Sequence, residues 1–414
     1  MVCHRSFGSM TSFKPDTNHI HQPERSHVPF RSLNVGIERA STVVFDDLDA
    51  FEDRASRLYD GFSYGLYGTP TSRALEEHIA SLEGGTRAIV TPSGQSAIVV
   101  ATMACVAAGD QVLVPDTLYG PAKDMAQRIF APLGVNIGVY DPQIDERIKE
   151  LITPRTKLIW VESPGSATLE VQDIPAIVRV AKASGALVAA DNTWASHNLF
   201  RPLDHGVDIA MQALSKHASG HGDLLMGSLA VRDEALFRRL KDTARYLGYG
   251  VSPDECALCE RGLKTMPLRM RHAEATAAKV ISWLKAQPQV ARVLHPGEPD
   301  HPGHAVWKRD FTGAAAVFGV IFTPCSRAVQ SAALSALKLF QIGASWGGVH
   351  SLVAPSDPRK GRKFCEWLPD GPYWRLSIGL EDSADIIADL GAGCGILATE
   401  PGRPGGEPPS QPAE

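Results

Sequence analysis

Strands and helices alternate through the first half of the chain, and this alternation constrains the fold more than any other feature. Six short apolar runs have the length and composition of buried strands, at 87–94, 111–116, 136–141, 156–163, 186–192 and 208–215. Amphipathic or small-residue helical patterns lie between or before them, at 71–85, 95–110, 120–134 and 171–185. Strands that alternate with helices predict an α/β fold with a mostly parallel sheet flanked by helices.

The length of the chain predicts more than one domain. Its 414 residues exceed what one hydrophobic core usually serves. A long helical pattern at 254–290 is followed by shorter strands and helices, which indicates a smaller C-terminal α+β domain. We therefore expect an N-terminal arm (1–60), an α/β domain (61–255), the α+β domain (256–397) and a disordered Pro/Gly-rich tail (398–414).

Charge and composition exclude several classes of partner. The 41 Lys and Arg residues against 46 Asp and Glu residues leave a formal charge of −5, without a basic block, so we expect neither nucleic acid nor an anionic membrane as a partner. No apolar run is long enough to span a bilayer, and no signal-peptide pattern occurs at the start. Seven irregularly spaced cysteines fit a reducing compartment, so the expected location is cytoplasmic.

No metal site is expected. Cys256 and Cys259 form one C-x-x-C pair, but no second cysteine or histidine pair completes a zinc site. His217 and His221 are four residues apart, in a glycine-rich segment rather than in a helix.

The predicted strands carry polar side chains where they end. In open parallel sheets, ligands bind at the carboxyl ends of the strands. Those ends hold Thr91-Pro-Ser-Gly, Asp116-Thr-Leu-Tyr, Glu162-Ser-Pro-Gly, Asp191-Asn-Thr-Trp and Ser215-Lys216. Aspartate, tyrosine, Ser-Gly and lysine at one edge indicate a ligand site there.

Lys216 and Asp191 together predict a particular cofactor. A lysine in an apolar, partly dry site can hold an aldehyde as a Schiff base, although a lysine that only pairs with a carboxylate would explain Lys216 alone. A buried Asp191 needs a cation or several donors, and a pyridinium nitrogen is such a cation. This combination is the protein signature of pyridoxal 5′-phosphate (PLP).

Other strand ends supply the remaining contacts that PLP and an amino acid would need. Ser93, Gly94 and Gln95 lie between a predicted strand and a helix, where main-chain amides can bind the phosphate, and Ser215 could add a hydroxyl. Tyr119, just beyond the strand 111–116, could lie against the pyridine ring. A separate apolar strand carries Arg375, whose guanidinium suits the carboxylate of an amino acid.

Five segments resemble the Cys/Met-metabolism family of PLP enzymes. They are TKLIWVESPGSATLEVQDIPAI, ALVAADNTWAS, GVDIAMQALSKHASGHGDLLMGS, SWGGVHSL and WRLSIGLED. The resemblance runs in order from about residue 34 to residue 398. It implies the PLP-dependent transferase-like fold (fold type I), usually in a homotetramer of two catalytic dimers that share residues at each active site.

The resemblance also implies roles for individual residues of the cofactor site. By position, Lys216 would be the Schiff-base lysine, Asp191 the partner of the pyridinium nitrogen and Tyr119 the residue stacked on the ring. The implied phosphate contacts are Gly94, Gln95 and Ser215.

Substrate contacts and a contact between chains are implied as well. Arg375, with Ser345 and Trp346 of SWGG, would hold the substrate carboxylate. Tyr64 would reach the phosphate of the neighbouring chain's cofactor and join Lys216 and Tyr119 among the catalytic residues. Many members of the family have an arginine two positions after this tyrosine, where this chain has Leu66.

The function implied is a carbon–sulfur lyase that acts on an amino-acid thioether. The resemblance is greatest to members that cleave L-cystathionine, or a related cysteine S-conjugate, by β-elimination to a thiol, pyruvate and ammonia. Two alternatives are open: γ-elimination or γ-replacement by the same family, and a PLP-binding protein without lyase activity. Relatives often carry a tyrosine and a His-Ser-Asp run after the lysine, where this chain has His217 and His221-Gly-Asp223, so the substrate is the least constrained part of the prediction.

Overall fold

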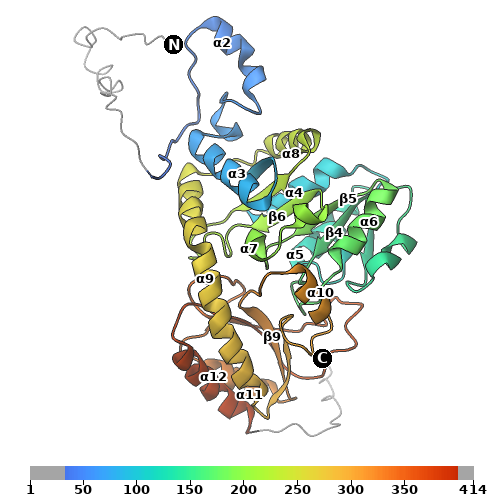
Figure 1. The fold of residues 1–414 in the computed structure, drawn as a ribbon, viewed down its shortest axis with the longest axis vertical. Coiled ribbons are helices and arrows are strands. Elements are labelled where there is room, and N and C mark those ends of the chain that lie inside the picture. Colours follow the sequence, from blue (N-terminus) through green and yellow to red (C-terminus); the bar gives the residue numbers. More distant parts are fainter. Residues whose placement is uncertain (1–32, 400–414) are drawn as a thin grey trace, which may run out of the picture. The chain divides into compact units, whose positions relative to one another are not determined.

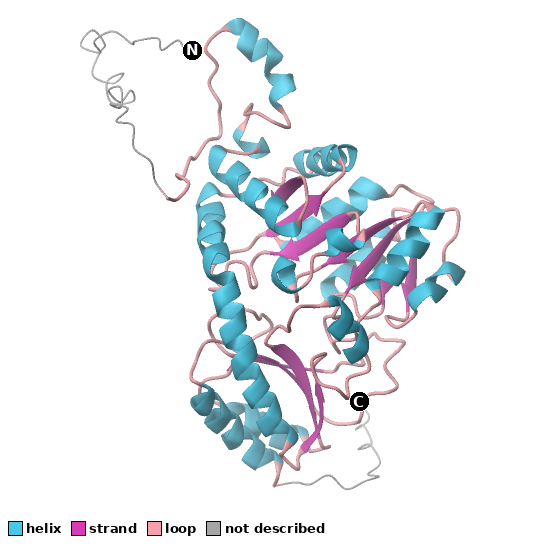
Figure 2. Ribbon diagram, in the orientation of Figure 1, coloured by secondary structure: helices cyan, strands magenta, loops and turns pink. Residues whose placement is uncertain are grey.

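The computed structural model describes residues 33–399, and within that range the strands form two sheets with helices packed around them. Figures 1 and 2 show the larger sheet among α3 to α8 and the smaller one beside α9 to α12. Residues 1–32 of the predicted arm and 400–414 of the predicted tail lie outside the described residues.

The larger sheet is mixed but mostly parallel. Its seven strands, counted within residues 33–399, have the order β1-β7-β6-β5-β4-β2-β3. They are β1 (Arg87–Thr91), β2 (Gln111–Pro115), β3 (Asn136–Tyr140), β4 (Thr156–Glu162), β5 (Leu187–Asp191), β6 (Ile209–Ala213) and β7 (Gly227–Val231). Only β7 runs against its neighbours, because it pairs antiparallel with both β1 and β6. The carboxyl ends of the other six strands therefore share one edge of the sheet.

Helices cover this sheet, and their ends follow from local sequence. They are α3 (Pro70–Glu83), α4 (Gly94–Cys105), α5 (Gly120–Met125), α6 (Ile174–Ser184), α7 (Ser196–Leu199) and α8 (Glu234–Tyr246), with α2 (Leu48–Glu52) preceding them. Ser93 caps α4, since its hydroxyl accepts from the Ser96 N–H and the Ser96 hydroxyl accepts in return from the Ser93 N–H. Helix α6 begins at the Asp173 cap and ends at Gly185 in the left-handed conformation.

The second sheet has five strands among the described residues and is mostly antiparallel, in the order β10-β11-β12-β9-β8. They are β8 (Val290–Leu294), β9 (Val317–Phe322), β10 (Gln341–Ile342), β11 (Leu352–Ser356) and β12 (Tyr373–Ser377). The accompanying helices are α9 (Pro253–Lys285), α10 (His304–Asp310), α11 (Arg327–Ser335) and α12 (Ser383–Leu397).

The predicted secondary structure is confirmed in its main lines. Each of the six predicted strands is present, and the fold is the predicted α/β class with a second, smaller sheet. The predicted helix at 120–134 is shorter, because α5 passes into a π-helical turn at Ala126–Phe130. Strand β7 and helix α8 were not predicted. The expected division after residue 255 falls inside α9, which packs on α3 and on β8.

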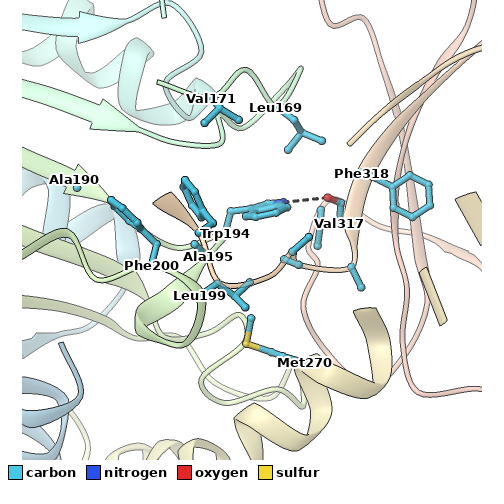
Figure 3. Close-up of a cluster of buried hydrophobic side chains, with 14 of the residues drawn as sticks. Leu169, Val171, Ala190, Trp194, Ala195, Leu199, Phe200, Met270, Val317 and Phe318 are labelled. Atoms are coloured by element: carbon cyan, nitrogen blue, oxygen red, sulfur yellow. Dashed lines mark hydrogen bonds between the residues drawn. The ribbon is translucent and has the colours of Figure 1, made fainter. Parts of the chain in front are cut away.

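A continuous hydrophobic core connects the two sheets. Figure 3 shows Trp194, from the segment after β5, beside Val317 of β9, and Met270 of α9 belongs to the same cluster. The Trp194 indole N–H donates to the Val317 carbonyl at 3.0 Å. Because this contact lies three residues after Asp191, the second sheet is held close to the carboxyl edge of the first.

No helix within residues 33–399 combines the length and the hydropathy required to cross a bilayer.

Candidate active site

The structure brings several of the predicted residues together at the carboxyl edge of the larger sheet. Lys216 follows β6, Asp191 ends β5, and Tyr119 follows β2. Their charges act on one another and on Arg375 of β12, because each of the four pKa values is shifted by at least one of the others. Residues 119, 191, 216 and 375, far apart in sequence, therefore form one electrostatic group.

The Lys216 amine is placed to act as a base. Its Nζ donates to Ser345 Oγ at 2.9 Å and lies 5.6 Å from the centre of the Trp346 ring. Burial lowers the pKa of Lys216, and repulsion from Arg375 lowers it further, while Asp191 acts in the opposite direction. A lowered pKa increases the fraction of free amine at neutral pH, which is the form that can bind an aldehyde or accept a proton.

Asp191 is a buried carboxyl with a defined orientation. It is 8% exposed, and its Oδ1 accepts from the Thr193 N–H at 3.0 Å. The Thr193 hydroxyl accepts in turn from the Ala213 N–H at 2.9 Å, which ties the end of β5 to β6. Burial raises the pKa of Asp191, whereas the Thr193 hydrogen bonds and Lys216 oppose the rise. A cation brought next to this carboxyl would stabilise its ionised form.

Tyr119 presents an exposed ring beside these groups. Its side chain is 43% exposed, while its N–H donates to Glu162 Oε2 at 2.6 Å. Burial of the phenol raises the pKa of Tyr119, and the negative charges of Asp191 and Glu162 add to the rise. The main chain is thus anchored to β4 and the ring is free to contact a ligand.

The turn from β1 into α4 forms a narrow cradle. A Cβ on Gly94 would lie 2.7 Å from the Ala213 Cβ, and one on Gly227 would lie 2.4 Å from the Ser93 carbonyl oxygen. The first N–H groups of a helix such as α4 have no partner within the helix. Gln95 lies in this turn, and its buried Oε1 has no hydrogen-bond partner. The free N–H groups at the start of α4 are donors that fit a phosphate group, whereas the Gln95 oxygen is an acceptor and adds no donor.

Arg375, Ser345 and Trp346 also lie together. The Arg375 guanidinium donates through Nη2 to the carbonyls of Ala344 at 2.6 Å and Ser345 at 3.3 Å. Burial lowers the pKa of Arg375. A guanidinium with main-chain carbonyls as partners can exchange them for a carboxylate, which gives stronger, charge-assisted hydrogen bonds.

Two predicted residues have other surroundings. The described contacts of Tyr64 are a bridge to Thr42 and an edge contact with the Tyr67 ring, 5.8 Å between centres. Within residues 33–399, no hydrogen bond or ring contact joins Tyr64 to Lys216. Ser215 adjoins Lys216, and its N–H donates to the Met226 carbonyl at 3.4 Å.

The sequence did not single out two residues that shape this site. Arg269, on α9, donates through Nη2 to the carbonyls of His217 at 2.9 Å and Gly262 at 2.8 Å, and so fixes the segment after Lys216. Glu162 was noted as a strand end but received no role. The one sequence signal for Glu162 was its position at the end of a predicted strand. The sequence around Arg269 contains no signal that predicts its role.

The histidines after Lys216 bind main-chain carbonyls. His217 Nε2 lies 3.1 Å from the Trp194 carbonyl, and burial lowers the pKa of His217 to about 4. His221 Nδ1 lies 2.6 Å from the Ser219 carbonyl. Within residues 33–399 no group of three or more His, Cys, Asp or Glu side chains is arranged to hold a metal ion.

Comparison with known proteins places this chain in a family. The signature of the Cys/Met metabolism PLP-dependent enzymes matches residues 16–394. A cystathionine beta-lyase of Bordetella avium is 38% identical over 86% of this chain and 91% of its own length. A cystathionine beta-lyase of Salmonella typhimurium is 37% identical over 93% of this chain and 99% of its own.

Solved structures give the same result. A cystathionine gamma synthase from Xanthomonas oryzae pv. oryzae, in complex with aminoacrylate and cysteine, superimposes with a TM-score of 0.82 at 29% identity. The match covers 89% of this chain and 94% of that one. The chain described here belongs to the Cys/Met metabolism family of PLP-dependent enzymes.

The residues present fit the cofactor of this family. The buried carboxyl of Asp191 suits a pyridinium nitrogen. The half-buried amine of Lys216 suits an aldehyde. The turn at Gly94, where only a residue without a Cβ fits against Ala213, presents the free amide donors of α4, which suit the phosphate.

Proposed function

We propose that this protein is a carbon–sulfur lyase that cleaves L-cystathionine, or a related cysteine S-conjugate, by β-elimination. One observation carries the proposal: the Lys216 amine lies under the influence of both the Asp191 carboxyl and the Arg375 guanidinium. Asp191 suits a cofactor ring and Arg375 suits the carboxylate of an amino acid, and Lys216 Nζ and the Arg375 guanidinium both donate to Ser345. The relatives named cystathionine beta-lyase support this choice of reaction.

The residues that would hold the cofactor lie at the carboxyl ends of the strands of the larger sheet. Lys216, Asp191 and Tyr119 would contact its aldehyde, ring nitrogen and ring face, and Ser93, Gly94, Gln95 and Ser215 its phosphate. When bound, PLP supplies an electrophilic carbonyl for the substrate amine and a ring that accepts the electron pair left at Cα.

The protein side chains would bind the substrate and move protons. Arg375, with Ser345 and Trp346, orients the substrate carboxylate. Lys216 Nζ, whose lowered pKa favours the free amine, removes the Cα proton. The Cβ–S bond then breaks, and Lys216 or Tyr119 returns a proton to the departing sulfur. With one water the products are homocysteine, pyruvate and ammonia.

A γ-elimination is the second candidate, because solved structures of γ-enzymes resemble this chain closely. A panel of thioethers separates the two reactions. Cysteine thioethers should give pyruvate at rates well above those for homocysteine thioethers of equal size. If the homocysteine thioethers are the better substrates and give 2-oxobutyrate, the β-lyase assignment is wrong.

We also propose the assembly and setting that usually accompany this activity. The protein would act as a cytoplasmic homotetramer of two catalytic dimers in transsulfuration and methionine biosynthesis. Within each chain, 61–255 would serve as the PLP-binding domain, 256–397 as the smaller domain, and the arm within 1–60 would bring Tyr64, just beyond it, to the neighbouring site.

Subunit mixing tests the contribution of Tyr64 from a second chain. Tyr64→Ala and Arg375→Ala proteins are combined under conditions that allow exchange and are assayed at a substrate concentration low enough that each variant alone is nearly inactive. A mixed dimer would have one site with both residues intact and one with neither, so about a quarter of parental activity should return with free exchange. If exchange is demonstrated and no activity returns, Tyr64 acts within its own chain or not at all.

A further inference from the structure

Glu162 lies beside the proposed cofactor residue Asp191 and has no role in the mechanism above. It is the last residue of β4, and its register partner on the parallel neighbour β5 is Asp191. Paired residues of neighbouring strands project from the same face of a sheet. Both side chains are buried, at 6% and 8% exposure, so two carboxyl groups share one water-excluded edge.

The hydrogen bonds of Glu162 reach the segment that carries Tyr119. Its Oε2 accepts from the Tyr119 N–H at 2.6 Å, and its Oε1 accepts from the Ser166 hydroxyl. One carboxyl therefore joins the chain beyond β2 to the turn beyond β4. Tyr119 itself is 43% exposed, so its ring is accessible to a ligand.

The two carboxyls differ in their electrostatic support. Asp191 has the Thr193 donors and the Lys216 amine nearby. Glu162 has only hydrogen-bond donors, and within residues 33–399 it takes part in no ion pair. Burial raises the pKa of Glu162 well above its ordinary value, and the charge of Asp191 raises it further. Two adjacent buried carboxylates cannot both stay ionised without a cation.

The groups around Glu162 come from each neighbouring element. Asp191 lies on β5, Tyr119 follows β2, and Tyr140 lies on β3, where the charge of Glu162 would raise the pKa of its buried phenol. The hydrogen bonds from Ser166 and from the Tyr119 N–H favour the ionised form of Glu162, but burial and the charge of Asp191 outweigh them, so the pKa of Glu162 is raised.

We propose that Glu162 is a positioning residue that works as an uncharged carboxylic acid: it anchors the Tyr119 main chain and leaves Asp191 as the single ionised carboxylate for the cofactor ring. An ionised glutamate would anchor Tyr119 equally well, but it would compete with Asp191 for the same cation. The neutral acid supplies the anchor without that competition.

This inference rests on the proposed cofactor site, and its tests do not depend on lyase activity. They read the charge of a carboxyl and the binding of PLP, so a failed substrate assignment would leave them unaffected. Conversely, an ionised Glu162 would leave the proposed reaction intact.

The experiment compares Glu162→Gln with Glu162→Ala in the PLP-loaded protein. Glutamine keeps an uncharged acceptor for the Tyr119 N–H, so its dissociation constant for PLP should stay within about threefold of the parent. The pH midpoint of the cofactor's visible absorbance should also be unchanged. Alanine leaves the Tyr119 and Ser166 donors unpaired, so the dissociation constant should rise at least about tenfold. If the glutamine variant shows the same loss as alanine, the proposal is wrong.

Infrared spectroscopy reads the proton directly. In protein labelled with ¹³C-glutamate, the parent should show a protonated carboxylic-acid band at pH 8 that Glu162→Gln lacks. Glu83→Gln is the matched control, because Glu83 is another buried glutamate, it is hydrogen-bonded to Gln212, and burial raises its pKa to about 7. The band should persist in the Glu83→Gln protein, which keeps Glu162, so Glu83 is excluded as its source. Its absence there would show that Glu162 is ionised and would overturn the proposal.

Discussion

The cofactor side and the substrate side of this site are built in different ways. On the cofactor side, Asp191 ends a core strand, is 8% exposed and is held by the Thr193 N–H. On the substrate side, Ser345 is exposed in a loop, and the Arg375 guanidinium donates to the Ala344 and Ser345 carbonyls of that loop. Lys216 belongs to both sides, since it follows β6 and donates to Ser345.

This difference has a consequence for ligand binding. The sheet edge orients its carboxyl groups through the core, so the cofactor would find its partners already in place. The loop carbonyls bound to Arg375 are neutral partners, which a substrate carboxylate would replace. We therefore expect changes on the cofactor side to alter the chemical step and changes on the substrate side to alter substrate affinity.

Lys216 connects the two sides, so its removal should have the largest effect. Lys216→Ala deletes both the amine that binds the aldehyde and the proton carrier, and turnover should fall at least ~10³-fold. Steady-state kinetics with L-cystathionine, at equal PLP occupancy, measures the loss. Turnover near the parental rate would remove Lys216 from the mechanism.

Asp191→Asn tests the cofactor side alone. The buried carboxylate would no longer stabilise a cationic ring nitrogen, so kcat should fall about 10²-fold or more, on the scale of one preorganised electrostatic group. The KM should change little because Arg375 is untouched. If instead KM rises while kcat is retained, Asp191 does not support the chemical step.

Arg375→Ala tests the substrate side. Loss of a charge-assisted hydrogen-bonded pair should raise KM about 10- to 100-fold, while the visible absorbance of the bound cofactor stays as in the parent. Arg375→Lys is the control. It keeps the positive charge but cannot form bidentate hydrogen bonds to a carboxylate, so it should recover only part of the affinity for substrate. Equal losses of PLP and substrate affinity would contradict the division into two sides.

A smaller, pH-dependent effect should come from the core beneath the cofactor side. Glu83 accepts a hydrogen bond from Gln212 of β6, and burial raises the pKa of Glu83 to about 7. Since this folded-state pKa lies above the unfolded value, the group stabilises the fold at low pH, and that contribution is lost as pH rises through about 7. Between pH 6 and pH 8 the free energy of unfolding should fall by about 1 kcal/mol relative to Glu83→Gln.

Denaturant titrations of parent and variant at equal protein concentration measure that difference. A parallel pH dependence of the two proteins would show that Glu83 is ionised throughout the range.

The sequence predicted the residues of the cofactor side better than the neighbouring strand and side chains that hold them in place. Asp191 and Lys216 end apolar runs, and the rule that parallel strands place their carboxyl ends at one edge is enough to bring them together. Strand β7 escaped prediction because it begins at Gly227 in a glycine-rich segment, where close approach to the Ser93 carbonyl requires the absence of a Cβ. This contact depends on the tertiary structure, and no pattern in the local sequence predicts it.

Contacts between residues far apart in the sequence were the other feature that was not predicted. Arg269 donates to the His217 carbonyl, 52 positions earlier in the sequence. In the sequence of its helix, Arg269 resembles an ordinary exposed arginine. The role of Glu162 depends on which strand pairs with which, and the alternation of strands and helices does not give the order of the sheet. Arg375 was predicted because an arginine in an apolar strand needs an anion, although its present partners are loop carbonyls.

Product analysis with L-cystathionine tests the central claim most directly. The PLP-loaded protein is incubated with the substrate, and both 2-oxo acids and both thiols are quantified beside a Lys216→Ala control. We predict pyruvate, homocysteine and ammonia in equal amounts from the parent, and at least ~10³-fold less from the control. The appearance of 2-oxobutyrate with cysteine, or the absence of any 2-oxo acid, would contradict a β-lyase built on Lys216, Asp191 and Arg375.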